Sequence, residues 1–387
     1  MKRILYLCGN LFPLHSGDSI YSYSILERLT SNYKVDLISL CQFQLMKDNK
    51  VLSNIENKLN FVKLVNYKIS YTKFLANVLK YGNDKQYDLS EFKLAIHERL
   101  KKFDYDYIVV DHLRLAYLYK SLRKVRPSPA KLVLVQHNIE FSNFLELRTE
   151  SKFWEKFKLT LCNYNLKEFE HKALKQFDYL WCISEGDKSY FDKITKDSKK
   201  SVVIPPYFQY KSVKSSVALK SNSYNLLFLG SMFWYPNIHG ITWFIDNVFN
   251  KLLEKDNRYK LYIVGNSPSV EILKRANNNI IVTGRVEDVD EYIKRADLMI
   301  VPLFKGGGVK IKVMESIMKG LPVIATKEST KGYPEKIFSG GFCANTPKEF
   351  VASIMDINED YSKKISFIQQ GREYLKGCNT PLEFEET

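Results

Sequence analysis

The sequence lacks the features that mark several classes of protein. Its six cysteines are scattered, with no CxxC pair and no cysteine and histidine spacing suited to zinc. No apolar run approaches the roughly 20 residues that a bilayer span requires. The apolar run at the N-terminus is short and has no small-residue cleavage site after it, so we expect a first strand rather than a signal peptide. These absences argue against zinc modules and membrane-spanning proteins, and they favour a reducing cytoplasm.

What is present is the composition of a folded soluble protein. Of 387 residues, 45% are hydrophobic and 26% are charged, and this length is sufficient for two domains that each bury a sheet. Lysine and arginine (58) exceed aspartate and glutamate (43), which gives a formal net charge of +15. Such an excess favours an anionic partner, such as a nucleotide diphosphate or an acidic lipid. No nucleic-acid-binding signature is found, so no nucleic-acid partner is expected.

Short apolar runs alternate with longer helical patterns, which is typical of βαβ units and a parallel sheet. The strands expected in the first half are 3–7, 34–39, 107–111, 132–136, 179–183 and 202–204. Those expected in the second half are 226–229, 260–264, 280–283, 298–302 and 322–325. Each half therefore predicts one Rossmann-like, doubly wound α/β domain.

Residues 206–222 separate the halves, because two prolines are followed by a polar stretch rich in lysine and serine. We expect an N-terminal domain at 1–205, this linker, and a C-terminal domain at 223–387 whose last helix packs back on the N-terminal domain. Two such domains facing each other across a cleft bind ligands beyond the carboxyl ends of their strands. Functional residues are therefore expected at those ends.

The segment 302–326 is the most specific in the sequence. Gly306, Gly307 and Gly308 follow an expected strand and open an expected helix, where backbone N–H groups approach a phosphate without obstruction from Cβ atoms. Lys310 falls in the first turn of that helix, a position that the helix dipole makes unfavourable for a cation unless an anion is bound nearby. The pattern predicts a diphosphate site, and the alternative is a flexible glycine turn.

Lys312 and Glu315 are three residues apart and share a face of the same helix. Either they pair with each other, or the carboxylate is free to accept the two vicinal hydroxyls of a ribose. The strand expected at 322–325 brings a second strand end beside this helix, which favours a binding site over a plain turn.

From Leu226 to Tyr333 the sequence resembles the donor domain of glycosyltransferase family 4, in its branch with a glycine-rich basic loop. The matching motifs occur in order and extend over more than a hundred residues. They are Leu229-Gly230-Ser231-Met232 with Trp234, Pro236 and Asn237, then Ile263-Val264-Gly265, Thr283-Gly284-Arg285-Val286, Ala296-Asp297, and Gly320-Leu321-Pro322-Val323-Ile324-Ala325. The resemblance implies a GT-B fold and a nucleotide diphosphate sugar as donor substrate, without a further cofactor.

Carried over to this sequence, the resemblance makes Glu315 the glutamate that usually holds the donor ribose. Gly307 stands eight residues earlier, where many members have another glutamate near the donor sugar. Many members also neutralise the diphosphate with an arginine and a lysine that residues 231–240 do not contain. The expected substitutes are Lys310, Lys312 and Arg285. Gly230 and Ser231 are expected to contact the donor, and Arg285 and Val286 to line the nucleobase, with a turn-capping role for Arg285 as the alternative.

In the first half, the loop after the first strand leads into a helix whose N-terminus is expected to bind substrate. Gly17 resembles a small residue that the family uses there, and Asp18 stands where many relatives have a second glycine. The alternative is that Asp18 or Ser19 caps the helix. His15 is a candidate contact to the acceptor, with a solvated loop histidine as the alternative.

His137 and Asn138 follow the apolar strand expected at 132–136, and they resemble the family's H-N-x-E segment, whose histidine lies near the transferred sugar. A histidine at the carboxyl end of a strand faces the crevice rather than the core. The alternative is a buried histidine bonded between loops. The pair Asp111-His112 at the end of another strand is a weaker analogue. Glu170 is expected to be structural, whereas Ser184 and Glu185 are candidates for lining the cleft.

The long helix expected at 152–175 mixes aromatic residues with many lysines. It either lies on an anionic membrane surface near a lipid-linked acceptor or packs on the core with a lysine-rich outer face.

The sequence thus predicts a hexosyltransferase of bacterial surface polysaccharide assembly that acts on a saccharide or lipid-linked acceptor. We expect it in the cytoplasm, peripheral on the inner face of the cell membrane, with retention implied by the resemblance and with no bound metal, because no DxD motif follows a strand. His137, Lys310 and Glu315 are the expected catalytic residues. The alternatives are a non-catalytic subunit that binds sugar nucleotides and a GT-B epimerase.

Overall fold

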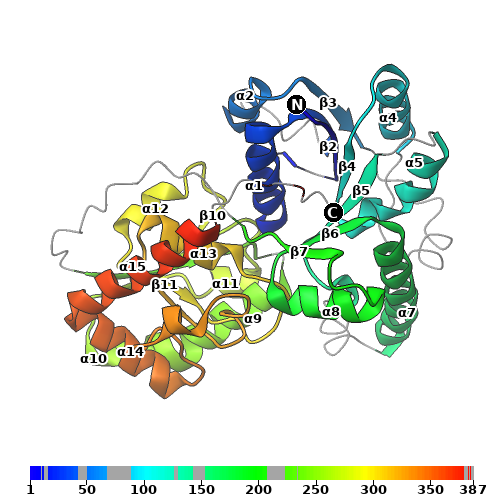
Figure 1. Cartoon of the computed structure of the whole chain (residues 1–387). Helices are drawn as coiled ribbons and strands as arrows, with labels where there is room; N and C mark the ends of the chain where they lie inside the picture. Colours follow the sequence, from blue (N-terminus) through cyan, green and yellow to red (C-terminus); the bar gives the residue numbers. More distant parts are fainter. Residues whose placement is uncertain are drawn as a thin grey trace. The chain divides into compact units, whose positions relative to one another are not determined.

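The computed structural model describes residues 1–9, 11–12, 16–41, 50–67, 89–125, 130–142, 153–206, 223–232, 234–378, 382 and 384. The chain divides into two compact units (Figure 1). The first unit comprises Met1–Tyr207 together with Thr380–Thr387, and the second comprises Phe208–Asn379. The linker predicted at 206–222 lies outside the described residues except for Pro206.

The first unit contains a parallel sheet of seven strands in the order β3-β2-β1-β4-β5-β6-β7. The strands are β1 (Arg3–Cys8), β2 (Lys34–Cys41), β3 (Phe61–Asn66), β4 (Tyr107–Asp111), β5 (Lys131–Gln136), β6 (Tyr179–Cys182) and β7 (Ser201–Val203). The order reverses between β1 and β4, which is where a doubly wound sheet binds its ligand. Both strands are almost fully buried, as expected of a parallel sheet covered on two faces.

Helices cover both faces of this sheet, with α1 on one side and α4, α5 and α7 on the other (Figure 1). They are α1 (Gly17–Asn32), α2 (Lys50–Glu56), α4 (Ser90–Lys102), the 3-10 helix η2 (Leu113–Leu118), α5 (Tyr119–Val125), α7 (Phe153–Gln176) and α8 (Glu185–Thr195). In α7, side chains are described from Tyr164 onward. There Leu166, Ala173 and Leu174 are buried while Lys167 and Lys172 are exposed, so this half of the helix packs on the core with a basic outer face.

The C-terminal end of the chain returns to the first unit. The ring of Phe384 stacks on Tyr107 at 3.5 Å between centroids and on Trp181 at 5.1 Å. Its backbone N–H donates to the hydroxyl of Tyr33 at 3.2 Å. The last helix, α15 (Tyr361–Cys378), belongs to the second unit, where Phe367 packs on Phe342. The segment that packs on the first unit is therefore the short one after the last helix, because the ring of Phe384 stacks on aromatic residues of β4 and β6.

The second unit contains five parallel strands in the order β10-β9-β8-β11-β12. They are β8 (Tyr224–Leu229), β9 (Tyr259–Val264), β10 (Ile280–Gly284), β11 (Leu298–Val301) and β12 (Val323–Ala325). The order reverses between β8 and β11. Together the two sheets confirm the predicted α/β class with two Rossmann-like domains, and β3 is the described strand that the sequence pattern missed, since only Val65 in it is fully buried.

The helices of the second unit vary widely in length. They are α9 (Tyr235–Phe244), the π-helical turn η3 (Ile245–Phe249), α10 (Asn250–Lys255), α11 (Val270–Leu273), α12 (Asp290–Arg295), α13 (Ile311–Lys319), the 3-10 helix η4 (Glu335–Phe338), α14 (Pro347–Glu359) and α15. The π-helical turn η3 separates α9 from α10, and α11 is a single turn. Within the described ranges, no helix has the length and apolar character needed to cross a membrane.

Candidate functional site

The loops after β8 and β11 meet at the point where the order of the second sheet reverses. β8 is followed by Gly230 and Ser231, and β11 is followed by the loop that contains the three glycines. Gly306 and Gly308 have φ values of 99° and 73°, which side chains with a Cβ rarely adopt. The loop therefore depends on glycine at these two positions to turn into α13.

Lys310 holds the glycine run from its far end. Its ammonium donates to the carbonyl oxygens of Gly307 and Gly308, each at 2.9 Å, and to that of Gly306. Lys310 is the N-cap of α13 rather than a residue of its first turn, and the hydroxyl of Tyr333 donates to its carbonyl oxygen at 3.0 Å. With its carbonyls gathered on one cation, the loop is fixed in shape ahead of any ligand.

Lys312, in the first turn of α13, reaches across to the end of β8 and to α9. Its ammonium donates to the carbonyl of Leu229 at 2.5 Å and to Oδ1 of Asn237 at 2.9 Å. The amide of Asn237 in turn donates to the carbonyl of Ser231 at 2.8 Å. Burial lowers the pKa of Lys312 to about 7, and the charge of Lys310 contributes to this shift. Lys312 is therefore a second basic group at the reversal point, and an anion bound beside it would favour its protonated, charged form.

Glu315 pairs with Lys319 and not with Lys312. Its carboxylate accepts from Lys319 at 2.6 Å, and Lys319 also pairs with Asp290 at 2.5 Å. Lys312 bonds to Leu229 and Asn237 instead, so the alternative of a Lys312–Glu315 pair is wrong. The Glu315 side chain is 18% exposed.

Arg285 and Val286 follow Gly284 at the carboxyl end of β10, the edge strand two places from β8. Arg285 is exposed and Val286 is half-buried. They lie at the same edge of the sheet as the glycine loop.

In the first unit, Ser16 caps α1, with its side chain accepting from the backbone N–H of Ser19. The alternative that Asp18 or Ser19 is the cap is therefore wrong. Gly17 and Asp18 are the first two residues of the helix, and the Asp18 side chain is 53% exposed. His15 lies outside the described residues. Without a capping role, Asp18 is available to contact a ligand.

The strongest electrostatic cluster of the first unit lies where β1, β4 and β5 end. Nε2 of His137 is 2.6 Å from Oδ1 of Asp111, and both side chains are buried. The hydroxyl of Tyr6 donates to the other oxygen of Asp111 at 2.6 Å. Asp18 lies 3.9 Å from Nδ1 of His137 and 3.8 Å from Nε2 of His112. The structure thus brings together three residues that the sequence placed at separate strand and helix ends.

Opposite charges control protonation in this cluster. Burial alone would lower the pKa of His137, but the carboxylate of Asp111 outweighs it and raises that pKa. Burial would likewise raise the pKa of Asp111 and of Asp18, but the nearby histidines hold both below their usual range. Both carboxylates are therefore ionised around His137.

His112 differs from His137 in its partner. Its backbone has φ of 87°, a strained value for a residue with a side chain. Arg114 donates to Nε2 of His112 at 2.9 Å, so that nitrogen is an acceptor. Burial, followed by the charge of Arg114, lowers the pKa of His112. The sequence pattern gave no signal for Arg114, because its role arises from the turn that η2 makes after β4.

Oxygen and nitrogen atoms of Asp18, His112 and His137 lie within 4.8 Å of one another, a spacing at which three such atoms could hold a metal ion. The guanidinium of Arg114 already occupies the His112 nitrogen nearest Asp18 and adds a positive charge beside it. A cation at that nitrogen would have to displace it. We therefore assign no metal to this cluster.

The segment after β5 is fixed by a buried carboxylate on α7. Glu170 accepts from the backbone N–H of Glu140 at 3.1 Å and of Phe141 at 3.4 Å. Burial raises the pKa of Glu170 to about 8. Asn138 is half-buried within the segment that this carboxylate holds. Glu170 thus positions the residues beside His137 and has the structural role predicted for it.

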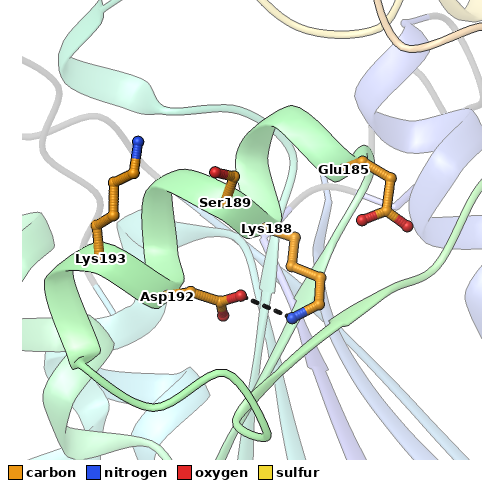
Figure 2. A pocket seen from close by; sticks show the side chains of 5 residues that line it. All are labelled: Glu185, Lys188, Ser189, Asp192 and Lys193. Carbon is orange, nitrogen blue, oxygen red and sulfur yellow. Dashed lines mark hydrogen bonds and ion pairs between the residues drawn. The ribbon is translucent and has the colours of Figure 1, made fainter.

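Ser184 and Glu185 lie at the start of α8. Ser184 is its N-cap and bonds to Asp187, so the hydroxyl is committed to the helix. A surface hollow of about 410 Å³ beside this helix is lined by Glu185, Lys188, Ser189, Asp192 and Lys193 (Figure 2). Lys188 pairs with Asp192 at 2.7 Å within it. All of these residues belong to one helix, and the hollow shows no convergence of groups from several elements.

Comparison with known proteins finds one family model that matches part of the second unit. Residues 223–360 match the family model described as glycosyl transferases group 1. This stretch covers the described sheet of the second unit, including the loops after β8 and β11.

Two relatives cover more of the chain. An uncharacterised 44.6 kDa protein in the cps region of Klebsiella pneumoniae is 23% identical over 378 residues, covering 93% of this chain and 90% of that protein. An uncharacterised glycosyltransferase of Methanocaldococcus jannaschii is 24% identical over 302 residues, covering 72% of each.

Among solved structures, Anabaena HepE in complex with UDP aligns with a TM-score of 0.62 at 15% identity, covering 97% of this chain and 95% of that one. This likeness confirms the GT-B fold. Membership of glycosyltransferase family 4 stays a prediction.

Proposed function

From the match of residues 223–360 to group 1 glycosyl transferases, we propose that this protein transfers a hexose from a nucleotide diphosphate sugar to a saccharide or lipid-linked acceptor. The observation that carries the proposal is the convergence of the glycine loop, Lys310 and Lys312 with the loop after β8 at the reversal point of the sheet. Open α/β sheets bind their ligands at such a point.

The second unit is the proposed donor site. Lys312 and the positive end of α13 neutralise the diphosphate, and Lys310 keeps the glycine loop in the shape that receives it. Glu315 accepts hydrogen bonds from the ribose with the oxygen that its partner Lys319 leaves available. Gly230 and Ser231 contact the donor from the other side, and Arg285 with Val286 lines the nucleobase. HepE was crystallised with UDP, which agrees with a nucleoside diphosphate as the common part of the donor.

The first unit is the proposed acceptor site, with Gly17, Asp18, His15, His137 and Asn138 as its contacts. A carboxylate beside an imidazole recognises sugar hydroxyls, which both donate and accept hydrogen bonds. The reaction retains the anomeric configuration and needs no metal, because lysine ammonium groups and loop amides stabilise the leaving diphosphate. The protein acts in the assembly of bacterial surface polysaccharides, at the cytoplasmic face of the membrane.

The proposal is tested by mixing the purified protein with UDP-, GDP- and dTDP-sugars and an extract of lipid-linked oligosaccharides, followed by mass spectrometry. We expect one donor to be consumed with addition of one hexose to an acceptor. Lys312→Ala and Glu315→Ala should abolish this, whereas Lys251→Ala, an exposed lysine on α10, should not. A product formed from the donor alone would indicate an epimerase, and nucleotide binding without turnover would indicate a non-catalytic subunit.

A further inference from the structure

His137 has one committed nitrogen and one unused nitrogen. Nε2 contacts the buried carboxylate of Asp111 at 2.6 Å, and the side chain is only 2% exposed. Nδ1 is buried and has no hydrogen-bond partner among the described residues. A buried polar atom without a partner is costly unless a ligand or water satisfies it. The geometry around Nδ1 therefore points to a bound group.

Oδ1 of Asp18 lies 3.9 Å from Nδ1. This distance is too long for a direct hydrogen bond, yet it allows a single oxygen atom to contact both groups at ordinary hydrogen-bond lengths. Asp18 is half exposed, so the space beside it is open to solvent. The arrangement suits an oxygen that enters from solvent and meets His137 at its inner end.

We propose that Asp111 is a positioning residue that keeps His137 protonated on both nitrogens, so that one hydroxyl of a sugar substrate bridges Nδ1–H of His137 and the carboxylate of Asp18. In this arrangement Nε2–H donates to Asp111, Nδ1–H donates to the hydroxyl oxygen, and the hydroxyl donates its own proton to Asp18. Every donor then has an acceptor. The inference rests on the proposed function, since it names how the acceptor site holds its substrate.

A hydroxyl fits this gap better than an anion or a metal ion. An anion would lie against the carboxylate of Asp18, and a metal ion would compete with Arg114 for the ring nitrogen of His112. A hydroxyl carries no charge, and it can accept from the imidazolium while donating to the carboxylate. The tight packing of Tyr21 against the His137 ring, at 5.1 Å between centroids, also fixes the ring plane.

The charge of His137 depends on all of its neighbours. Asp18 and Tyr21 face it from α1, Tyr6 and Cys8 reach the same carboxylate from β1, and Asp111 contacts it from β4. The ring of His112 is tilted against the ring of His137, at 4.8 Å between centroids, and Arg114 donates to His112. Glu140 lies three residues after His137 in the chain. The carboxylates favour the charged ring, while His112 and burial oppose it. Asp111 is the neighbour in direct contact, so its removal should dominate.

The charge state is measured by NMR of the full-length protein with ¹⁵N-labelled histidine, using His137→Gln to assign the signal. We expect both nitrogens of His137 to be protonated at pH 7 in the wild type. In Asp111→Asn the pKa of His137 should fall, because an adjacent opposite charge has been removed. A neutral His137 at pH 7 in the wild type, or an unchanged pKa in Asp111→Asn, would overturn the proposal.

The transfer assay then tests the bridging hydroxyl. Transfer should fall as pH rises through the pKa of His137, and in Asp111→Asn this alkaline limit should move to lower pH. Asp18→Asn should raise KM for the acceptor at least tenfold and leave KM for the donor unchanged; an unchanged acceptor KM would contradict the bridge. Asp36→Asn is the matched control, since Asp36 is a buried aspartate on β2 paired with Arg99. It should lower stability without moving the pH profile.

The two levels of failure are distinguishable. If the wild type transfers no sugar while the NMR results are as expected, the proposed function fails and the assignment of His137 stands. If transfer occurs and the alkaline limit is the same in Asp111→Asn, the assignment fails and the proposed function stands.

Discussion

The carboxyl ends of the two sheets carry polar groups of different kinds. In the second unit, two lysines donate to backbone carbonyls at the carboxyl end of the sheet. In the first unit, imidazoles are surrounded by carboxylates, and charges of both signs alternate over a few ångströms. The first arrangement suits an anion and the second suits an uncharged polyhydroxyl compound. Two sheets of similar topology therefore differ in the ligand that each can hold.

The largest effect is expected when the lysine at the reversal point is removed. Lys312→Ala removes the ammonium group that donates to the carbonyl of Leu229 at the end of β8. Nucleoside diphosphate affinity should therefore fall by about tenfold to a hundredfold. Isothermal titration calorimetry with UDP, GDP and dTDP measures this. His137→Gln in the first unit should leave the same affinity within twofold. Equal losses in both variants would remove the distinction between the two sites.

An effect of comparable size, on stability, distinguishes the two units by their aromatic contacts. Phe384→Ala should lower the stability of the first unit by about 3 kcal/mol, because it empties the pocket against Tyr107 and Trp181. Phe367→Ala is the matched change in the second unit, where that ring is buried against Phe342. Hydrogen exchange read by mass spectrometry should show faster exchange in β4 and β6 for the first variant, and in α15 for the second. Exchange that rises equally in both units would show that the tail does not act on the first unit alone.

A further effect, on the pH dependence of stability, is expected from the buried carboxylate that fixes the segment after β5. Burial raises the pKa of Glu170 to about 8 from an ordinary 4.5, so the folded state binds a proton that the unfolded state releases between these values. The stability from this group is fully present below about pH 4.5 and is lost as pH rises to about 8. Glu170→Gln keeps the neutral shape, so its unfolding free energy should depend less on pH in this window. Parallel pH curves of denaturant unfolding for wild type and variant would contradict this.

Strand positions and the candidate site were largely predictable from sequence, while contacts across the fold were not. Apolar runs located eleven of the strands within two residues, and they placed His137 and the glycine run at strand ends. β3 was missed because it carries few buried residues. Lys312 was expected to face Glu315, since helix spacing is a local property, but a carbonyl 83 residues earlier in the chain attracts it. The docking of Phe384 likewise depends on a pocket formed by distant strands.

The central claim, that nucleoside diphosphates bind where β8 and β11 diverge, is tested most directly by hydrogen exchange of the full chain with and without saturating nucleoside diphosphate. The account predicts slower exchange confined to two stretches of the second unit, residues 229–240 and 304–315, together with no change around His137. Protection that appears elsewhere in the second unit, or around His137 and Asp111 alone, would contradict it.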